Sequence, residues 1–257
     1  MAQVFANLPV TAAPPLFADR RAAGRLLAAR LRHALPAPGG QQPGEEPSRA
    51  SPAPRDAGTL SSAPRDAGTL VLALPRGGVA VAREVADALA APLDVLVTRK
   101  IGYPPQPELG VGAIAEGGEP VYDDEFLRRL RLSRGDLVPV VARERAELDR
   151  RVKVYRGGRP PPDVAGRLVI LVDDGLATGV TARAALRSLR SRSAGRTVLA
   201  VPVAAPSSAA AMLREADSVV ALALPETFRA VGEWYVSFGQ LTDADVLELL
   251  DRGGEAS

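Results

Sequence analysis

Two adjacent carboxylates, Asp173 and Asp174, come directly after an unbroken apolar run at residues 168–172. Such a run is typical of a strand that is buried on both faces of a parallel sheet. Glycines and threonines follow the acids, and from about Thr178 the apolar residues recur at three- and four-residue steps, the spacing of a helix. The segment therefore predicts a strand, an acidic turn and a loop that opens a helix. The backbone N–H groups of such a loop favour an anion, most naturally a phosphate.

The acidic pair narrows the choice of ligand. Carboxylates repel phosphate, so Asp173 and Asp174 are expected to face groups that donate hydrogen bonds beside it. A ribose diol fits this description, and so does a hydrated cation. The alternative without a ligand is a capped helix after a buried strand, in which the acidic turn is incidental.

A second loop of the same kind follows the apolar run at residues 70–74. It consists of Pro75, Arg76, Gly77 and Gly78. A predicted helix begins at about Val79, so paired glycines and an arginine stand at a helix start, which indicates another anion site. A plain turn before a helix has the same composition and is the alternative.

A third apolar run, residues 93–98, ends in the basic pair Arg99 and Lys100. Residues 101–118 are rich in Gly and Pro and indicate a long loop, with a short strand near its end that pairs with residues 119–122. The loop contains the spacing GxGxxA, but no strand precedes that motif, so a dinucleotide site is discounted.

Strands that alternate with helices predict a right-handed, doubly wound and mostly parallel α/β sheet. Further strands are expected at residues 197–203 and 218–222. Asp19, the pair Ser133 and Asp136, and the segment 242–245 are expected to cap helices. Ligands in such sheets bind beyond the carboxyl ends of strands, where the winding order switches. The loops that carry Gly, Arg, Lys and Asp are therefore expected to form one composite site.

The chain is expected to form one domain with an insertion. Residues 1–35 supply an irregular arm and a helix that belong to this domain, and residues 70–257 form its main part. Residues 36–69 have almost no bulky apolar side chain and predict a disordered insertion. Within it, residues 51–60 recur as residues 61–70 with one change, a tandem repeat that is too short and polar for a solenoid.

The composition excludes several classes of function. A formal net charge of +2 over 257 residues gives no nucleic-acid footprint. The chain has no cysteine, which excludes disulfides, a thiol nucleophile and zinc–thiolate sites. No apolar run approaches the roughly 18 residues of a membrane span. A cytoplasmic protein without nucleic-acid or membrane partners is expected.

The segment from Asp173 to Thr181, DDGLATGVT, resembles the phosphoribosyl-pyrophosphate (PRPP) signature of the type I phosphoribosyltransferases. The stretches LPRGG, RKIGYPPQPELGVGAIAEGG, YRGGRP and VGEWY are similar to those of an uncharacterised bacterial subgroup of that family. The resemblance covers most of residues 70–240. It implies the family's fold with a small hood region, and an enzyme that moves a 5-phosphoribosyl group from PRPP to a nitrogenous acceptor and releases pyrophosphate.

The resemblance also implies a role for each motif. The donor loop comprises Gly175, Ala177, Thr178, Gly179 and Thr181, and the last three of these are implied to bind the 5-phosphate. Asp173 and Asp174 are implied to bind the ribose diol and, through water, Mg²⁺. Those that bind pyrophosphate, the last two after closure of a flexible lid, are Arg76, Gly77, Gly78, Arg99 and Lys100. Those that stack on the acceptor base, unless they are hood core, are Phe228 and Trp234.

In this family the pyrophosphate loop often holds a non-proline cis peptide, and the bond Arg76–Gly77 is predicted to hold it here. Ala177 matches the adenine-type members, whereas the metal-binding hood acid of the guanine type is absent near Val236. The sequence does not name the acceptor. Two other functions stay open: a non-catalytic regulator that senses PRPP, and a hydrolase of phosphoribosyl compounds. A role in nucleotide metabolism and a homodimer are further expectations.

Overall fold

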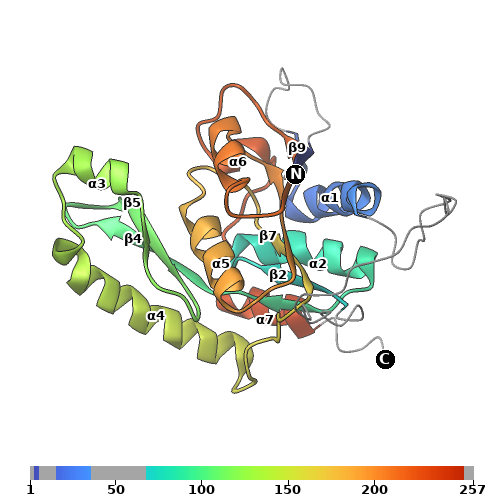
Figure 1. The fold of residues 1–257 in the computed structure, drawn as a ribbon. Coiled ribbons are helices and arrows are strands. Elements are labelled where there is room, and N and C mark those ends of the chain that lie inside the picture. Colours follow the sequence, from blue (N-terminus) through green and yellow to red (C-terminus); the bar gives the residue numbers. More distant parts are fainter. Residues whose placement is uncertain (1–2, 6–15, 36–67, 252–257) are drawn as a thin grey trace, which may run out of the picture.

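A six-stranded parallel sheet forms the centre of the protein, in the order β1-β9-β8-β7-β2-β3 (Figure 1). The computed structural model describes residues 3–5, 16–35 and 68–251. The strands of this sheet are β1 (Gln3–Phe5), β2 (Thr69–Ala73), β3 (Leu93–Val95), β7 (Leu168–Val172), β8 (Arg196–Val203) and β9 (Ser218–Ala223). The predicted α/β class with a mostly parallel sheet is confirmed.

Helices cover both faces of this sheet because its strands are apolar on both sides. In β7, Ile170 packs in the cluster of one face and Leu171 in the cluster of the other. The helices of the first face are α1 (Arg20–Ala34), α2 (Gly77–Leu89) and α7 (Asp243–Asp251). Those of the second face are α5 (Val180–Ser191) and α6 (Pro206–Met212). The alternation of successive side chains along a strand explains why the predicted apolar runs are continuous.

A second, antiparallel sheet and two helices form an arm that projects to the left of the central sheet in Figure 1. Its elements are β4 (Thr98–Tyr103), β5 (Gln106–Ala115), β6 (Val121–Tyr122), α3 (Asp124–Leu130), the 3-10 turn η1 (Gly135–Leu137) and α4 (Val138–Arg156). The arm contains its own small apolar cluster, with Ile101, Val111, Leu127 and Leu137 buried.

The prediction of a long loop after Arg99 is therefore wrong. Its glycines mark places where two backbones approach closely within the antiparallel sheet: a Cβ on Gly102 would lie 2.3 Å from the Pro107 oxygen, and one on Gly112 would lie 2.6 Å from the Val121 oxygen. The predicted pairing of the loop's last part with residues 119–122 is confirmed, since Ala113 pairs with Val121. The GxGxxA motif lies inside β5, where it opens no helix.

The predicted helix caps are present. Asp19 accepts a hydrogen bond from the Ala22 nitrogen at 2.7 Å and caps α1. Ser133 and Asp136 bond each other's backbone N–H groups, but this box starts η1, which then continues into α4. The corresponding box at the start of α7 joins Thr242 and Asp245.

Several predicted boundaries need correction. Residues 3–5 are not irregular, because they pair with β9 as a parallel edge strand. The predicted strand at 93–98 divides into β3 and the start of β4. The structure describes Gly68 and Thr69 of the predicted insertion, and Thr69 already belongs to β2; the rest of it lies outside the described residues, so its predicted disorder stays a prediction.

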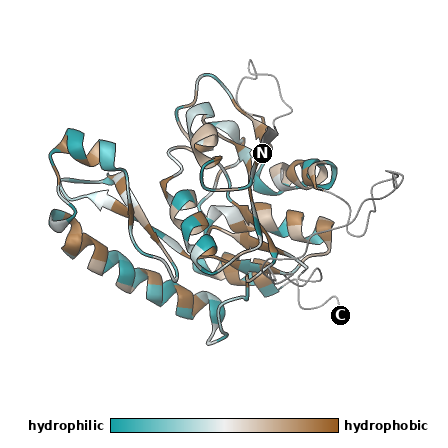
Figure 2. Cartoon of the chain, in the orientation of Figure 1, coloured by the Kyte–Doolittle hydropathy of each residue, from teal (hydrophilic) through white to brown (hydrophobic). Residues whose placement is uncertain are grey.

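Hydropathy follows this architecture. In Figure 2, α4 alternates between brown and teal along its length, as expected of a helix with one packed and one solvated face. Across residues 3–5, 16–35 and 68–251, no helix combines the length and apolar character that crossing a bilayer requires.

Candidate active site

The winding order of the central sheet switches between β2 and β7. The chain passes from β2 outward to β3, and later from β7 outward in the other direction to β8 and β9. Ala73 and Val172 are register partners at the ends of these strands, and the Leu74 nitrogen donates to the Val172 oxygen at 2.9 Å. The two predicted anion loops therefore begin side by side at the place where open α/β sheets bind ligands.

The acidic pair stands against the first turn of α2. The Asp174 nitrogen donates to Asp173 Oδ1 at 2.8 Å. A Cβ on Gly78 would lie 2.8 Å from the Val172 oxygen and 3.3 Å from Asp173 Oδ1. Burial, and next the charge of Asp174, raise the pKa of Asp173 well above its ordinary value. Two close acids on a desolvated edge are unfavourable for stability alone, which points to use by a ligand.

Arg20 is a site residue that the sequence did not reveal. Its Nε atom donates to Asp174 Oδ2 at 2.8 Å, and both side chains are largely buried. The contact spans 154 positions of the chain, and Arg20 stands next to a helix cap in a segment with no motif of its own. Only the packing of α1 on α2 brings it to the switch point.

The donor loop has the geometry expected of an anion site. Gly179 has a φ of 73° and precedes α5, whose start has no side-chain cap, so no cap competes for its first N–H groups. Thr178 and Ala177 are exposed, and Thr181 is half-buried in the first turn of α5. Gly175 is buried beneath Val231, whose Cγ1 atom would lie 2.5 Å from an added Cβ.

The predicted basic pair is split between two faces of β4. Arg99 donates to Glu144 Oε2 of α4 at 2.9 and 2.7 Å, and the Glu144 side chain is 8% exposed. Lys100 instead donates to the Glu108 oxygen at 2.8 Å. Neighbouring residues of a strand point to opposite faces, so a basic pair on a strand cannot act as a unit. The opposite orientation of the two side chains was not predicted, because the segment after Arg99 was expected to be a loop.

Lys100 faces the donor loop across a pocket of about 390 Å³. The residues that line it from the arm include Lys100, Gly110, Asp123 and Phe126. Those that line it from the donor loop and α5 are Ala177, Thr178, Val180 and Arg183. The pocket thus brings two cations, Lys100 and Arg183, beside the N–H groups of the donor loop, and the acidic residues Glu108 and Asp123 line it as well.

We expect substitutions of Arg99 and Lys100 to have different effects. Arg99→Ala leaves the buried Glu144 with fewer partners and is expected to lower the free energy of unfolding by about 1–3 kcal/mol, without a change in PRPP affinity. Lys100→Ala is expected to leave stability unchanged and to weaken PRPP binding by about fivefold. Thermal unfolding and calorimetric titration of both variants measure this. An equal loss of PRPP affinity in the two variants would show that Arg99 and Lys100 both contact the ligand, as the sequence predicts.

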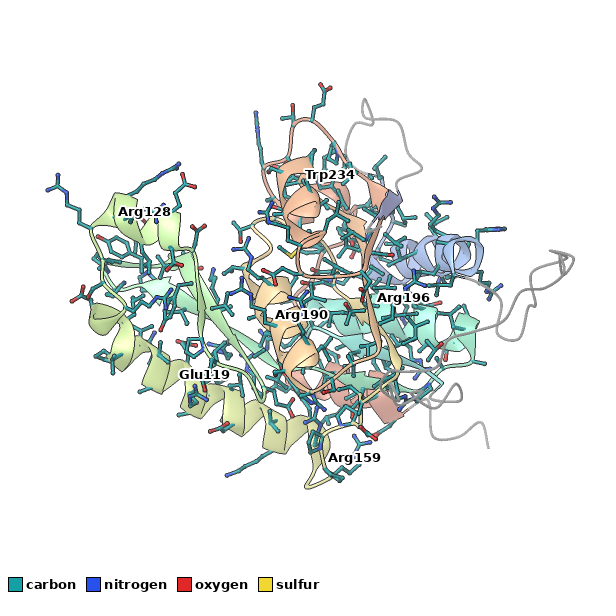
Figure 3. The ribbon with its side chains drawn as sticks, viewed as in Figure 1. Glu119, Arg128, Arg159, Arg190, Arg196 and Trp234 are labelled. Carbon is teal, nitrogen blue, oxygen red and sulfur yellow. The ribbon has the colours of Figure 1, made fainter. Side chains whose placement is uncertain are left out.

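The hood segment, residues 224–239, packs over the donor loop. Trp234 is 1% exposed and stacks on Phe228 at 6.4 Å between ring centres; Figure 3 labels it among the side chains of this region. Trp234 is therefore hood core, one of the two roles considered for it, whereas Phe228 is half-buried and retains accessible surface. The backbone N–H groups of Leu16 and Phe17 both donate to the Trp234 oxygen and so tie the hood segment to the residues just before α1.

The second anion loop is tied to α7. Arg76 lies half-exposed with Nη1 3.9 Å from Asp243 Oδ1. The cis peptide bond of this loop is Pro75–Arg76, one residue before the predicted Arg76–Gly77. Gly77 begins α2, and the helix has no side-chain cap, so the loop presents an N-terminal anion position beside Asp174.

The described residues contain no cluster of three His, Cys, Asp or Glu side chains that could enclose a metal ion. Mg²⁺ is commonly held by one or two carboxylates, several waters and the phosphates of a substrate. Asp173 and Asp174 at the edge of two anion loops fit that mode of binding, in which the ion arrives with the ligand.

Comparisons with known proteins agree with this geometry. Residues 63–231 match the family model of the phosphoribosyl transferase domain. Two proteins from strains of Mycobacterium tuberculosis, provisionally named phosphoribosyl transferases, are each 47% identical over 182 residues, which is 71% of this chain and 41% of the relative. The chain thus matches less than half the length of these relatives. A crystal structure of the protein TT1426 from Thermus thermophilus is 41% identical with a TM-score of 0.66, covering 91% of this chain and 97% of the other. The chain belongs to the phosphoribosyl transferase domain family.

Proposed function

We propose that this protein transfers the 5-phosphoribosyl group of PRPP to a nitrogenous base or a related acceptor and releases pyrophosphate. The observation that carries the proposal is the juxtaposition of two anion loops and an acid pair at the switch point between β2 and β7. PRPP has the matching sequence of groups: a pyrophosphate, a diol and a 5-phosphate. Family membership supports the same reaction.

In this proposal the donor lies across the ends of β2 and β7. The 5-phosphate binds the N–H groups at the start of α5, with Thr178, Gly179 and Thr181. The pocket cations Lys100 and Arg183 lie on the same side, so the proposal moves Lys100 from the pyrophosphate, its role by resemblance, to the 5-phosphate. The ribose diol donates hydrogen bonds to Asp173 and Asp174. The pyrophosphate binds Arg76, Gly77 and Gly78 at the start of α2, where the helix dipole favours negative charge.

The reaction breaks the bond between the anomeric carbon of the ribose and the pyrophosphate oxygen, and forms a bond from that carbon to the acceptor nitrogen. The residues of the two loops hold the reacting groups in place and stabilise the charge that develops on the leaving oxygen. Mg²⁺ bound with the donor, with Asp173 and Asp174 reaching it through water, would supply further neutralisation of that charge. Phe228 would offer its face to the acceptor under the hood segment. A cytoplasmic role in nucleotide metabolism is part of the proposal through the family resemblance.

Release of pyrophosphate from PRPP in the presence of Mg²⁺ tests the proposal, with a panel of purine and pyrimidine bases and a reaction without base. We expect release that depends on one base or a small set of bases. Release that is independent of base would identify a hydrolase. PRPP binding without any release would identify a regulator, and absence of both would overturn the donor assignment.

A further inference from the structure

Arg20, the first residue of α1, touches both the acid pair and the hood segment. Besides its bond to Asp174, its Nη1 atom donates to the backbone oxygen of Gly239 at 2.7 Å. The guanidinium carbon lies 3.8 Å from the centre of the Phe238 ring, the geometry of a cation–π contact. The side chain is 11% exposed, so three partners hold it in a largely desolvated position.

A second connection leads from the hood segment to the same aspartate. Tyr235 donates its hydroxyl to the backbone oxygen of Asp174, and its ring stacks on Phe238 at 5.0 Å between centres. Arg20, Asp174, Tyr235 and Phe238 therefore form a closed circuit of contacts. Both the carboxylate and the backbone of Asp174 are held from the hood side.

Arg20 also determines which carboxylate oxygen of Asp174 is available. Oδ2 is bonded to the guanidinium and lies against Gly77, where an added Cβ would approach it to 1.9 Å. Among the residues that the structure describes, none donates a hydrogen bond to Oδ1. Oδ1 is therefore the oxygen of Asp174 that the contact with Arg20 leaves available to a hydrogen-bond donor.

We propose, on the basis of the proposed function, that Arg20 is a positioning residue for the donor: it orients Asp174 toward the ribose diol and couples donor affinity to the hood segment. Lysine is a poor substitute, because a single ammonium group lacks the planar fork that bonds Asp174 and Gly239 at once while stacking on Phe238. Because Phe238 and Gly239 of the hood segment are the other partners of Arg20, a displacement of the hood segment is expected to change how Asp174 is held.

Calorimetric titration with PRPP tests this inference on the wild type, Arg20→Ala, Arg20→Lys and the control Arg25→Ala. Arg25 lies on the same helix, 61% exposed, with Nη1 3.7 Å from Glu84 Oε2. We expect the alanine variant to bind PRPP about tenfold more weakly, the lysine variant about threefold more weakly, and the control as the wild type does. Circular dichroism verifies folding, and Arg20→Lys carries the test if Arg20→Ala does not fold.

A double-mutant cycle distinguishes positioning from a general structural role. If Arg20 acts through Asp174, Arg20→Ala causes no further loss of PRPP affinity in an Asp174→Asn background. An equal loss in both backgrounds overturns the inference, and so does Arg20→Lys with wild-type affinity. Wild-type protein that binds no PRPP overturns the proposed function and this inference together. Wild-type binding with an unaffected Arg20→Ala variant overturns this inference alone.

Discussion

Asp173→Asn is expected to weaken PRPP binding by about 10- to 100-fold while leaving the protein folded and at least as stable as the wild type. The affinity falls because the diol loses a charged acceptor. The stability is retained, because the wild-type carboxylate is itself unfavourable in this position. Its burial and the neighbouring charge of Asp174 both disfavour the ionised form and raise its pKa. An amide of the same size keeps the acceptor for the Asp174 nitrogen and removes the repulsion.

The sign of the pH dependence follows from that raised pKa. An acid whose pKa is higher in the folded state binds its proton more tightly there, so ionisation costs stability as the pH rises from about 4 through the folded-state pKa. The advantage of Asp173→Asn over the wild type is therefore expected at neutral pH and is expected to vanish near pH 4. Thermal unfolding at several pH values measures it, and a destabilised variant at neutral pH would contradict the explanation.

Asp174→Asn provides the matched comparison. It loses the same type of acceptor, so PRPP affinity is again expected to fall by about 10- to 100-fold. In contrast to Asp173, Asp174 is paired with Arg20, and the neutral amide leaves that largely buried guanidinium without its counter-charge. Stability is therefore expected to fall by about 1–3 kcal/mol. Unchanged PRPP affinity and turnover in both asparagine variants would remove the diol assignment.

Gly77→Ala is expected to reduce PRPP affinity by at least about tenfold through steric displacement. The added Cβ would lie 1.9 Å from Asp174 Oδ2, 2.6 Å from its Cγ atom and 3.2 Å from Arg20 Nε, so the carboxylate must shift and its contact with Arg20 is disturbed. Overpacking of this kind costs about 1–3 kcal/mol, and a lower melting temperature is expected as well.

Gly68→Ala is the control for this prediction. Nothing lies within 4 Å of a Cβ at Gly68, so both stability and PRPP affinity are expected to match the wild type. Calorimetric titration and thermal unfolding of the two alanine variants give the comparison. A Gly77→Ala variant that binds PRPP as tightly as Gly68→Ala would show that the donor does not use the junction of these two loops.

The central sheet and its two anion loops could be predicted because local pattern and tertiary position agree there. The runs that became β2 and β7 are apolar on both faces, which only a covered parallel sheet accommodates. The arm could not be predicted, because glycine and proline also occur in a hairpin whose backbones pack closely, and composition does not separate the two cases. The helix α3 was missed in the same region.

Long-range contacts determine the features of the site that could not be predicted from the sequence. The separation of Arg99 from Lys100 depends on a strand register that the sequence does not display, and the burial of Trp234 depends on contacts with the start of α1. Arg20 becomes part of the site only through its contact with Asp174, which lies 154 positions away in the chain. Side chains whose role is set by such distant partners carry no periodic or spacing signal.

The arm's separate apolar cluster has a consequence for the energetics of ligand capture. A lid that is unstructured before binding must lose backbone freedom when it closes, at about 1–2 kcal/mol per residue that becomes ordered. The segment that carries Lys100 is instead held in an antiparallel sheet and supported by α4. Lys100 is thus presented by a preformed sheet, and the conformational entropy of its strands is lost on folding and not on ligand binding.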